Sequence, residues 1–289
     1  MTTALISIFY PSTDVREHVR AIASQVDVVY LCDNSPESHA QMFEGPDFPG
    51  NIRYTCFHTN LGLSIAFNQI LKDPDIPWND EDYIIFFDQD SLIKESHISK
   101  LIAVYDRARA QGIPIGCLGC AFFNTSHGAV EMPRAKQPLS DDTYAVSSII
   151  TSSMLTTYGN LRKIDFWDTH VFLDMADWNL CWRLRAAGML CCLTDTVILH
   201  HSVGSSEKKI GPLRLRVGHP MREYYQIREC MYLLWQPYTP LKYRVRFLAM
   251  LLVRSPLHVI FLDHRKERLG YITKGFLDFF RGKQGPMDP

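Results

Sequence analysis

Short apolar runs alternate with amphipathic stretches over the first 110 residues of the chain. Runs typical of β-strands cover residues 4–10, 26–33, 51–56 and 83–87, and helical patterns cover residues 14–24 and 64–71. Strands and helices that alternate in this way indicate a parallel sheet covered by helices. The run at 83–87 is apolar throughout, which predicts a strand buried on both faces.

The middle of the chain indicates strands and loops around one helix. That helix is predicted over residues 174–187, where Gly188 provides a stop signal. We therefore expect an α/β catalytic domain over residues 1–230.

The last section, residues 231–289, differs in composition. Between Lys242 and Lys283 there are ten Lys or Arg against three acidic residues, a local charge of +7 that leaves about −8 for the rest of the chain. Apolar clusters at 247–253 and 257–262 alternate with these cations, and both are too short to span a bilayer. The pattern predicts a basic, apolar helical tail that could lie on a membrane without crossing it.

Overall composition excludes several classes of protein. The formal net charge of −1 argues against a nucleic-acid binder. The N-terminal apolar run is short, has no basic leader and ends at Pro11, so we expect no signal peptide and a cytoplasmic location. Among eight cysteines, Cys117 and Cys120 form the only CxxC, which favours reduced structural cysteines over zinc or disulfides.

Polar residues gather where the predicted strands end. Asp33 and Asn34 end one strand, and Asp88, Gln89 and Asp90 end another. Ligands of open α/β sheets bind beyond the carboxyl ends of the strands. The chain has neither a GxGxxG after its first strand nor a P-loop, so this nucleotide site is of another type.

Asp88 and Asp90 form the strongest candidate metal motif. Two carboxylates one residue apart after an apolar strand are costly unless a cation or solvent compensates them. Mg²⁺ or Mn²⁺ that bridges a substrate diphosphate would fit. A solvated turn or a helix cap is the alternative.

Two further motifs suit a nucleotide. Asp33 could accept a hydrogen bond from a pyrimidine N3–H or a ribose hydroxyl, although a turn would use the same residues. In the run from Asn60 to Asn68, Gly62 lets the backbone approach a nucleotide and the two asparagines offer donors and acceptors. The alternative is a helix capped by Ser64.

Asp174 and Asp177 lie three residues apart at the start of the predicted helix, on one face. Carboxylates are favoured at helix starts, so Asp174 could be a cap. Asp177, beside Trp178, is the better candidate for a general base that deprotonates a sugar hydroxyl.

The region after the next strand carries histidines and arginines. His200 or His201 could complete a metal site with Asp90 or contact the diphosphate, and only one of the two would point into the site. Arg222 and Arg228 could clamp phosphates, and Tyr224 could stack on a sugar. An amphipathic helix with a buried aromatic face is the alternative for the tyrosines.

These motifs, in this order, resemble glycosyltransferase family 2, and within it the bacterial rhamnosyltransferases. The resemblance spans roughly the first 230 residues, and its most specific parts are Phe87 to Ser91 and the Arg-x-Tyr-Tyr-x-x-Arg run at 222–228. It implies an inverting single displacement and a GT-A fold, in which a nucleotide-binding half over about 1–110 abuts an acceptor half over 111–230. The chain departs from the family at Ser152–Ser153, where members often have Ser-Gly, and at Asn179, where they often have a second acid.

The resemblance also implies roles for the candidate residues. Asp33 would read the base, Asp88 and Asp90 would hold nucleotide and metal, and Asp177 would be the catalytic base. His201 matches the family's histidine better than His200 and would join the metal site. The donor site would include Phe9, Tyr10, Asp33, Asn60, Gly62, Asn68, Asp88, Gln89, Arg222 and Arg228. The acceptor site would include Asp174, Trp178 and Tyr224.

By resemblance the donor is dTDP-L-rhamnose. UDP-galactofuranose or a UDP-hexose remains open, because neither Asp33 nor Asn60 distinguishes thymine from uracil. The expected acceptor is a lipid-linked saccharide of bacterial surface polysaccharide synthesis such as O-antigen, with peripheral contact to the inner membrane. Two other classes remain: a non-catalytic sugar-nucleotide binding subunit, and a nucleotidyltransferase, whose Gly-rich, Arg-containing loop is missing.

Overall fold

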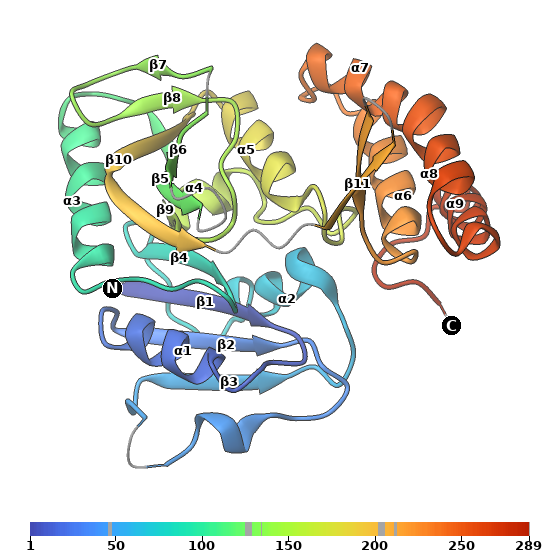
Figure 1. Cartoon of the computed structure of the whole chain (residues 1–289). Helices are drawn as coiled ribbons and strands as arrows, with labels where there is room; N and C mark the ends of the chain where they lie inside the picture. The colour runs from blue at the N-terminus through green and yellow to red at the C-terminus, as the bar shows by residue number, and fades with distance from the viewer. Residues whose placement is uncertain (46–47, 125–128, 134, 202–205, 211–212, 289) are drawn as a thin grey trace.

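The computed structural model describes residues 1–45, 48–124, 129–133, 135–201, 206–210 and 213–288 (Figure 1). Of 123–124, 129, 131, 200–201, 206–210 and 213–217 only the backbone is described. The strands are β1 Thr2–Ile8, β2 Val28–Asp33, β3 Ile52–Cys56, β4 Tyr83–Asp88, β5 Ile115–Asn124, β6 Ala129–Glu131, β7 Gln137–Pro138, β8 Tyr144–Val146, β9 Met154–Thr157, β10 Leu190–His201, β11 Ser206–Ile210 and β12 Leu213–Val217.

The helices are α1 Val15–Ala23, α2 Gly62–Leu71, α3 His97–Ala110, α4 Tyr158–Lys163, α5 Ala176–Ala186, α6 Arg222–Leu234, α7 Leu241–Ala249, α8 Ser255–Phe261 and α9 Arg265–Phe280. A 3-10 turn covers Ala40–Phe43, and a π-helical turn at Met250–Arg254 joins α7 to α8. No helix in the described ranges is long and apolar enough to cross a membrane.

The main sheet has the strand order β3-β2-β1-β4-β9-β5-β10-β8-β7, with β6 beside β5. The strands β3, β2, β1 and β4 are parallel, and β9 runs antiparallel between β4 and β5. In the register, Ile8 lies opposite Asp33 and Ser7 opposite Asp88. The carboxyl ends of β1, β2 and β4 therefore lie side by side at one edge of a mostly parallel sheet, as the sequence predicts.

Helices cover both faces of the sheet. On one face α1 and α3 pack through Val19, Ile22 and Leu101, and on the other α2 and α5 pack through Phe67 and Trp182. Successive strand residues alternate between these two cores, which is why the strands read as uninterrupted apolar runs.

The C-terminal helices gather on one side of the molecule (Figure 1). Gly275 of α9 packs so closely on α6 that a Cβ atom there would lie 2.8 Å from the Tyr224 carbonyl oxygen. The predicted boundary at residue 230 falls inside α6. Because α6 packs against α9, the helical C-terminal region begins with α6 rather than after it.

Candidate active site

The carboxyl ends of β1, β2 and β4 are joined by hydrogen bonds. The Phe9 N–H donates to Gln89 Oε1 at 2.8 Å, and the Tyr10 N–H donates to Ser35 Oγ at 2.8 Å. The Phe9 and Tyr10 rings are exposed and meet edge to face at 4.6 Å. Exposed rings at this edge offer an apolar surface on which a nucleotide base could pack.

Asp33 is fully buried at the end of β2, and its carboxylate is already hydrogen-bonded. It accepts from the Ser35 N–H at 2.8 Å and the Tyr54 hydroxyl at 2.6 Å, and His39 Nδ1 lies 2.9 Å away. Burial acts to raise the pKa of Asp33, but these hydrogen bonds outweigh it and hold the pKa below the ordinary value. A nucleotide that bonded Asp33 would have to replace one of these donors.

The loop before α2 connects the strand ends to the segment around Phe172. The Asn34 amide oxygen accepts from the Leu61 N–H at 3.0 Å, and the Asn60 amide oxygen accepts from the Gly62 N–H at 2.9 Å. Gly62 has φ +72°, and a Cβ atom there would lie 2.5 Å from the Phe172 carbonyl oxygen. The close approach that this glycine permits is therefore to the Phe172 segment.

The structure corrects the assignments of Asn68 and Ser64. Asn68 is 7% exposed, and its amide bonds both the carbonyl oxygen and the N–H of Trp167, at 2.8 and 3.1 Å. The Ser64 hydroxyl donates to the Val171 carbonyl oxygen at 2.7 Å and does not cap α2. Both side chains fix the segment at 167–171 onto α2, so Asn68 has a structural role in place of the predicted contact with the nucleotide sugar.

Two carboxylates, Asp88 at the end of β4 and Asp177 in α5, influence each other through their charges. Asp88 accepts from the Ser152 hydroxyl, and Asp177, in the first turn of α5, accepts from the Trp178 N–H at 2.7 Å. Burial, followed by the charges of Cys181, Asp88 and Asp174, raises the pKa of Asp177 well above its ordinary value. A carboxylate with a raised pKa is a stronger base toward a hydroxyl group.

The donor atoms at this edge fit a hard divalent cation. Asp88 and the exposed Asp90 supply carboxylate oxygens, which Mg²⁺ and Mn²⁺ prefer, and a cation there would relieve the repulsion between Asp88 and Asp177. Among the described side chains these acids do not form a three-ligand set. Further oxygens would have to come from the donor diphosphate or water. The predicted histidine ligand falls at 200–201, whose side chains lie outside the described residues.

Arg222 and Asp174 are brought together at the start of α6. The half-exposed Arg222 guanidinium bonds both Asp174 oxygens, and the Gln226 amide donates to Asp174 Oδ2 at 2.8 Å. The hydrogen bond to Asp174 raises the pKa of Arg222. The guanidinium is therefore held by Asp174, and a phosphate that bound Arg222 would compete with this ion pair.

Tyr224 and Arg228 lie in the interior, which corrects their predicted ligand roles. Tyr224 is fully buried and donates to Asp278 Oδ2 at 3.0 Å. Arg228 is 2% exposed and donates to the Tyr224 hydroxyl and to the Gly285 carbonyl oxygen, at 3.1 and 2.6 Å. They pack α6 onto α9 and the C-terminal segment, so the alternative of a buried aromatic face holds.

Trp178, in the first turn of α5, packs against α7. Its ring is 5.3 Å from that of Tyr243 and 6.2 Å from that of Trp182, and the Arg246 guanidinium lies 5.1 Å from the Trp178 ring centre. The C-terminal helices therefore border the first turn of α5. The sequence did not reveal Tyr243 and Arg246 as neighbours of the site, because nothing local connects α7 to α5.

Residues 6–156, slightly more than half of the 289-residue chain, match the sequence model of Glycosyl transferase family 2. The chain belongs to this family. It is 25% identical over 212 residues to the dTDP-rhamnosyl transferase RfbF of Shigella flexneri, an alignment that covers 70% of this chain and 69% of that protein. The predicted membership of the family, on the side of the rhamnosyltransferases, is confirmed.

The fold is also similar to the crystal structure of GalNAc-T7 with UDP, GalNAc and Mn²⁺. The TM-score is 0.58 at 10% sequence identity, and the match covers 97% of this chain and 56% of that one, so this chain spans little more than half of its length. At this identity the likeness shows the fold alone. The predicted GT-A fold, with a helical C-terminal region, is confirmed.

Two departures from the family pattern have structural explanations. Ser153, where glycosyltransferases of this family often have glycine, has φ +65°, and its hydroxyl lies 2.7 Å from His97 Nε2. That hydrogen bond helps to offset the cost of a left-handed serine. Asn179, in place of a second acid, donates to Asp168 Oδ2 at 3.0 Å.

Glu229 of α6 is a buried acid that the sequence did not single out. Its Oε1 accepts from the Phe172 and Leu173 N–H groups at 2.9 and 3.0 Å. Burial, with the charge of Asp174, raises the pKa of Glu229 to about 8. This carboxyl group ties α6 to the segment that leads into α5, and only burial in the fold distinguishes it from other glutamates.

Glu229→Gln should flatten the pH dependence of stability. Because the folded state raises the pKa of Glu229 from 4.5, it binds this proton more tightly than the unfolded chain. The contribution of Glu229 to the wild-type free energy of unfolding should therefore be fully present below about pH 4.5 and fall by about 1.4 kcal/mol per pH unit as pH rises toward 8. Gln keeps the Oε1 acceptor without titrating.

Urea titrations at several pH values would measure this effect, with exposed Glu37→Gln as the control. Equal slopes for wild type and Glu229→Gln would contradict the prediction.

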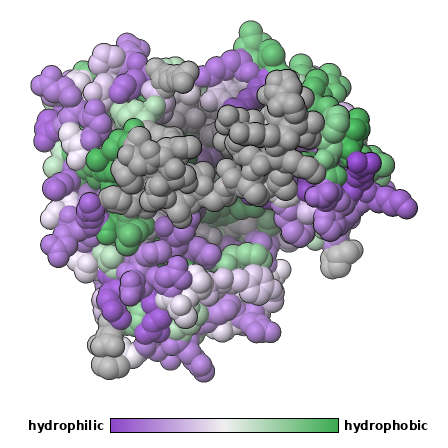
Figure 2. Space-filling view, viewed as in Figure 1, coloured by the Kyte–Doolittle hydropathy of each residue, from purple (hydrophilic) through white to green (hydrophobic). Residues whose placement is uncertain are grey.

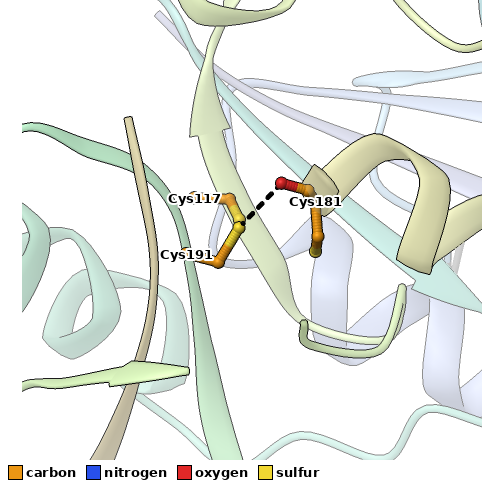
Figure 3. Close-up of side chains that lie close together, drawn as sticks. All are labelled: Cys117, Cys181 and Cys191. Carbon is orange, nitrogen blue, oxygen red and sulfur yellow. Dashed lines mark hydrogen bonds between the residues drawn. The ribbon is translucent and has the colours of Figure 1, made fainter. Parts of the chain in front are cut away.

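Three buried thiols form a separate cluster. Cys117 of β5, Cys181 of α5 and Cys191 of β10 have sulfur atoms within 4.8 Å of one another, and the Cys191 thiol donates to the Cys181 carbonyl oxygen at 3.2 Å (Figure 3). All eight cysteines are unpaired. The cluster packs α5 onto the sheet and offers only sulfur, which does not suit Mg²⁺ or Mn²⁺.

Proposed function

We propose that this glycosyltransferase moves L-rhamnose from dTDP-L-rhamnose to a saccharide acceptor, with inversion and with the help of Mg²⁺ or Mn²⁺. The observation that carries the chemistry is Asp177 in the first turn of α5, a carboxylate whose pKa is raised by burial and by nearby charges that include that of Asp88 at the end of β4. The similarity to the rhamnosyl transferase of Shigella flexneri supports the donor.

Asp177 acts as the general base. It takes the proton of an acceptor hydroxyl while that oxygen bonds the anomeric carbon, and the bond from this carbon to the diphosphate oxygen breaks. Attack from the face opposite the leaving group inverts the configuration. Trp178, next to Asp177, supplies an aromatic surface for the acceptor sugar, and Asp174 holds Arg222.

The donor occupies the carboxyl edge of the sheet. Phe9 and Tyr10 pack on the base, and Asp33, Asn60 and Gly62 shape the loops around it. Asp88 and Asp90, with Gln89 fixing the loop between them, would hold the metal ion, which would neutralise the charge of the departing diphosphate.

Arg222, which pairs with Asp174, would add a positive charge that binds the departing diphosphate. A binding subunit without activity would have no use for a carboxylate of raised pKa at this position. We propose a lipid-linked saccharide of bacterial surface polysaccharide synthesis as the acceptor.

Calorimetric titration of the protein with dTDP and with UDP, each with and without Mn²⁺, tests the donor. We expect Mn²⁺-dependent binding that favours dTDP, and at least about a tenfold loss of that binding in Asp90→Asn. Asp165→Asn is the control, because Asp165 is an exposed partner of Lys72 away from the strand edge.

A preference for UDP would move the donor to a uridine sugar such as UDP-galactofuranose or a UDP-hexose. Binding of neither nucleotide would overturn the proposal. In a turnover assay, release of nucleoside diphosphate rather than pyrophosphate would exclude a nucleotidyltransferase.

A further inference from the structure

The helix formed by α7, the π-helical turn and α8, residues 241–261, is apolar on two opposite faces. One face packs inward through Phe247, Leu251 and His258, which are 0%, 9% and 1% exposed. On the other face, Leu241, Val245, Leu248 and Leu252 recur at intervals of four, three and four residues. They are 76%, 60%, 43% and 73% exposed. These four side chains, here called the exposed stripe, lie along one side of the helix.

The exposed stripe is part of a larger hydrophobic surface. Three more exposed side chains of the same helix extend it: Val253, Ile260 and Phe261. Figure 2 shows hydrophobic side chains along the upper right of the molecule, where Figure 1 has α7 and α8. Exposed apolar patches of this extent are uncommon on monomeric proteins and mark surfaces that bind a partner.

The charge beside the exposed stripe indicates an anionic partner. Residues 241–261 contain four Lys or Arg and no Asp or Glu. Lys242 and Arg246 are exposed. A symmetric contact with a second copy would bring these like charges together, which is unfavourable. An anionic lipid surface satisfies both features, because phosphates meet the cations while apolar side chains enter the acyl region.

The same helix borders the catalytic helix. The Tyr243 ring lies 4.6 Å from the Trp182 ring of α5, and Arg246 lies over Trp178, next to Asp177. The exposed stripe is therefore separated from α5 by about one helix diameter, ~10 Å. A surface that held the stripe would lie close to the first turn of α5, where Asp177 lies.

We propose that the exposed face of residues 241–261 docks on an anionic lipid surface and so presents Asp177 to an acceptor anchored in that surface. The presentation of the acceptor rests on the proposed function. The docking itself rests only on the stripe and its cations. In the bound orientation the helix lies in the plane of the interface, with the exposed stripe toward the acyl region and the exposed cations at the level of the lipid phosphates.

Sedimentation of the full chain with lipid vesicles tests the docking. We expect the wild type to sediment with vesicles of phosphatidylcholine mixed with phosphatidylglycerol, to bind pure phosphatidylcholine far less, and to dissociate as salt is raised. Leu252→Asp and, separately, Leu241→Asp should each weaken binding by about tenfold or more, because a charge replaces an inserted apolar side chain. Val130→Asp is the matched control, since Val130 is 47% exposed on β6.

Three results would overturn the docking: no sedimentation of the wild type with anionic vesicles, unchanged binding by both stripe variants, or a dimer that Leu252→Asp dissociates without any vesicle binding. Titration with dTDP keeps this test separate from that of the proposed function. If the protein binds dTDP but not vesicles, only the docking proposal is refuted. If the protein binds vesicles but neither dTDP nor UDP, the docking proposal is supported and the proposed donor chemistry is refuted.

Discussion

Asp177→Asn is expected to lower the rate of sugar transfer by about 1000-fold while leaving nucleotide binding unchanged. Asn keeps an Oδ1 that can accept from the Trp178 N–H, as Asp177 does at 2.7 Å, so the first turn of α5 should stay in place. What it loses is the basic oxygen that takes the acceptor proton. The effect should therefore appear in kcat and in single-turnover rates, with little change in the KM for the donor.

The control for Asp177→Asn is Asp165→Asn. It removes an acid that pairs with Lys72 on the surface and should transfer sugar at the wild-type rate. Calorimetry with dTDP and Mn²⁺ would establish that both variants bind the nucleotide. Appreciable turnover by Asp177→Asn would contradict the assignment of Asp177 as the general base, whatever the effect of the substitution on nucleotide binding.

Gly62→Ala is expected to destabilise the fold by about 4 kcal/mol. About 1 kcal/mol comes from the left-handed conformation at φ +72°, and about 3 kcal/mol comes from the contact of the new methyl group with its neighbours. The Cβ atom would lie 2.5 Å from the Phe172 carbonyl oxygen and 2.6 Å from its ring. That oxygen cannot move away easily, because it accepts from the Leu63 N–H at 3.0 Å and the Phe172 N–H is held by Glu229.

Gly112→Ala separates the two contributions to this loss. Gly112 has φ +76°, and nothing lies within 4 Å of its ideal Cβ position, so the change should cost only about 1 kcal/mol. Urea unfolding of wild type and both variants would measure the difference. Equal losses in the two variants would show that Phe172 yields and that the close approach at Gly62 does not constrain α2.

The local pattern of the sequence was enough to predict which polar residues lie at the carboxyl edge of the sheet. Apolar runs that end in Asp33-Asn34 and Asp88-Gln-Asp90 placed polar residues at the ends of β2 and β4, and a parallel sheet aligns those ends at one edge. The position of Asp177 in the first turn of a helix was also local information. The C-terminal region was expected to be basic, apolar and helical for the same reason.

The local pattern could not show which polar side chains within the motifs bind a ligand and which bond to other parts of the protein. Asn68, Tyr224 and Arg228 have the chemistry of ligand-binding groups, but each is buried and bonded to a residue far along the chain: Trp167, Asp278 and Gly285, respectively. Glu229 shows the reverse. It looks like an ordinary helical glutamate, and only its burial raises its pKa to about 8.

The sequence by itself determined the four parallel strands β1 to β4, the helices α1, α2 and α5, the strand edge with its carboxylates, and the family, because periodicity, turn residues and short motifs are properties of neighbouring residues. The tertiary structure decided which polar groups remain open to a ligand, since that depends on which distant element covers each of them. It also decided that α7 lies on α5 with its other apolar face uncovered. Hydrophobic residues on both sides of a helix show that both faces favour burial, and only packing decides which face the protein itself buries.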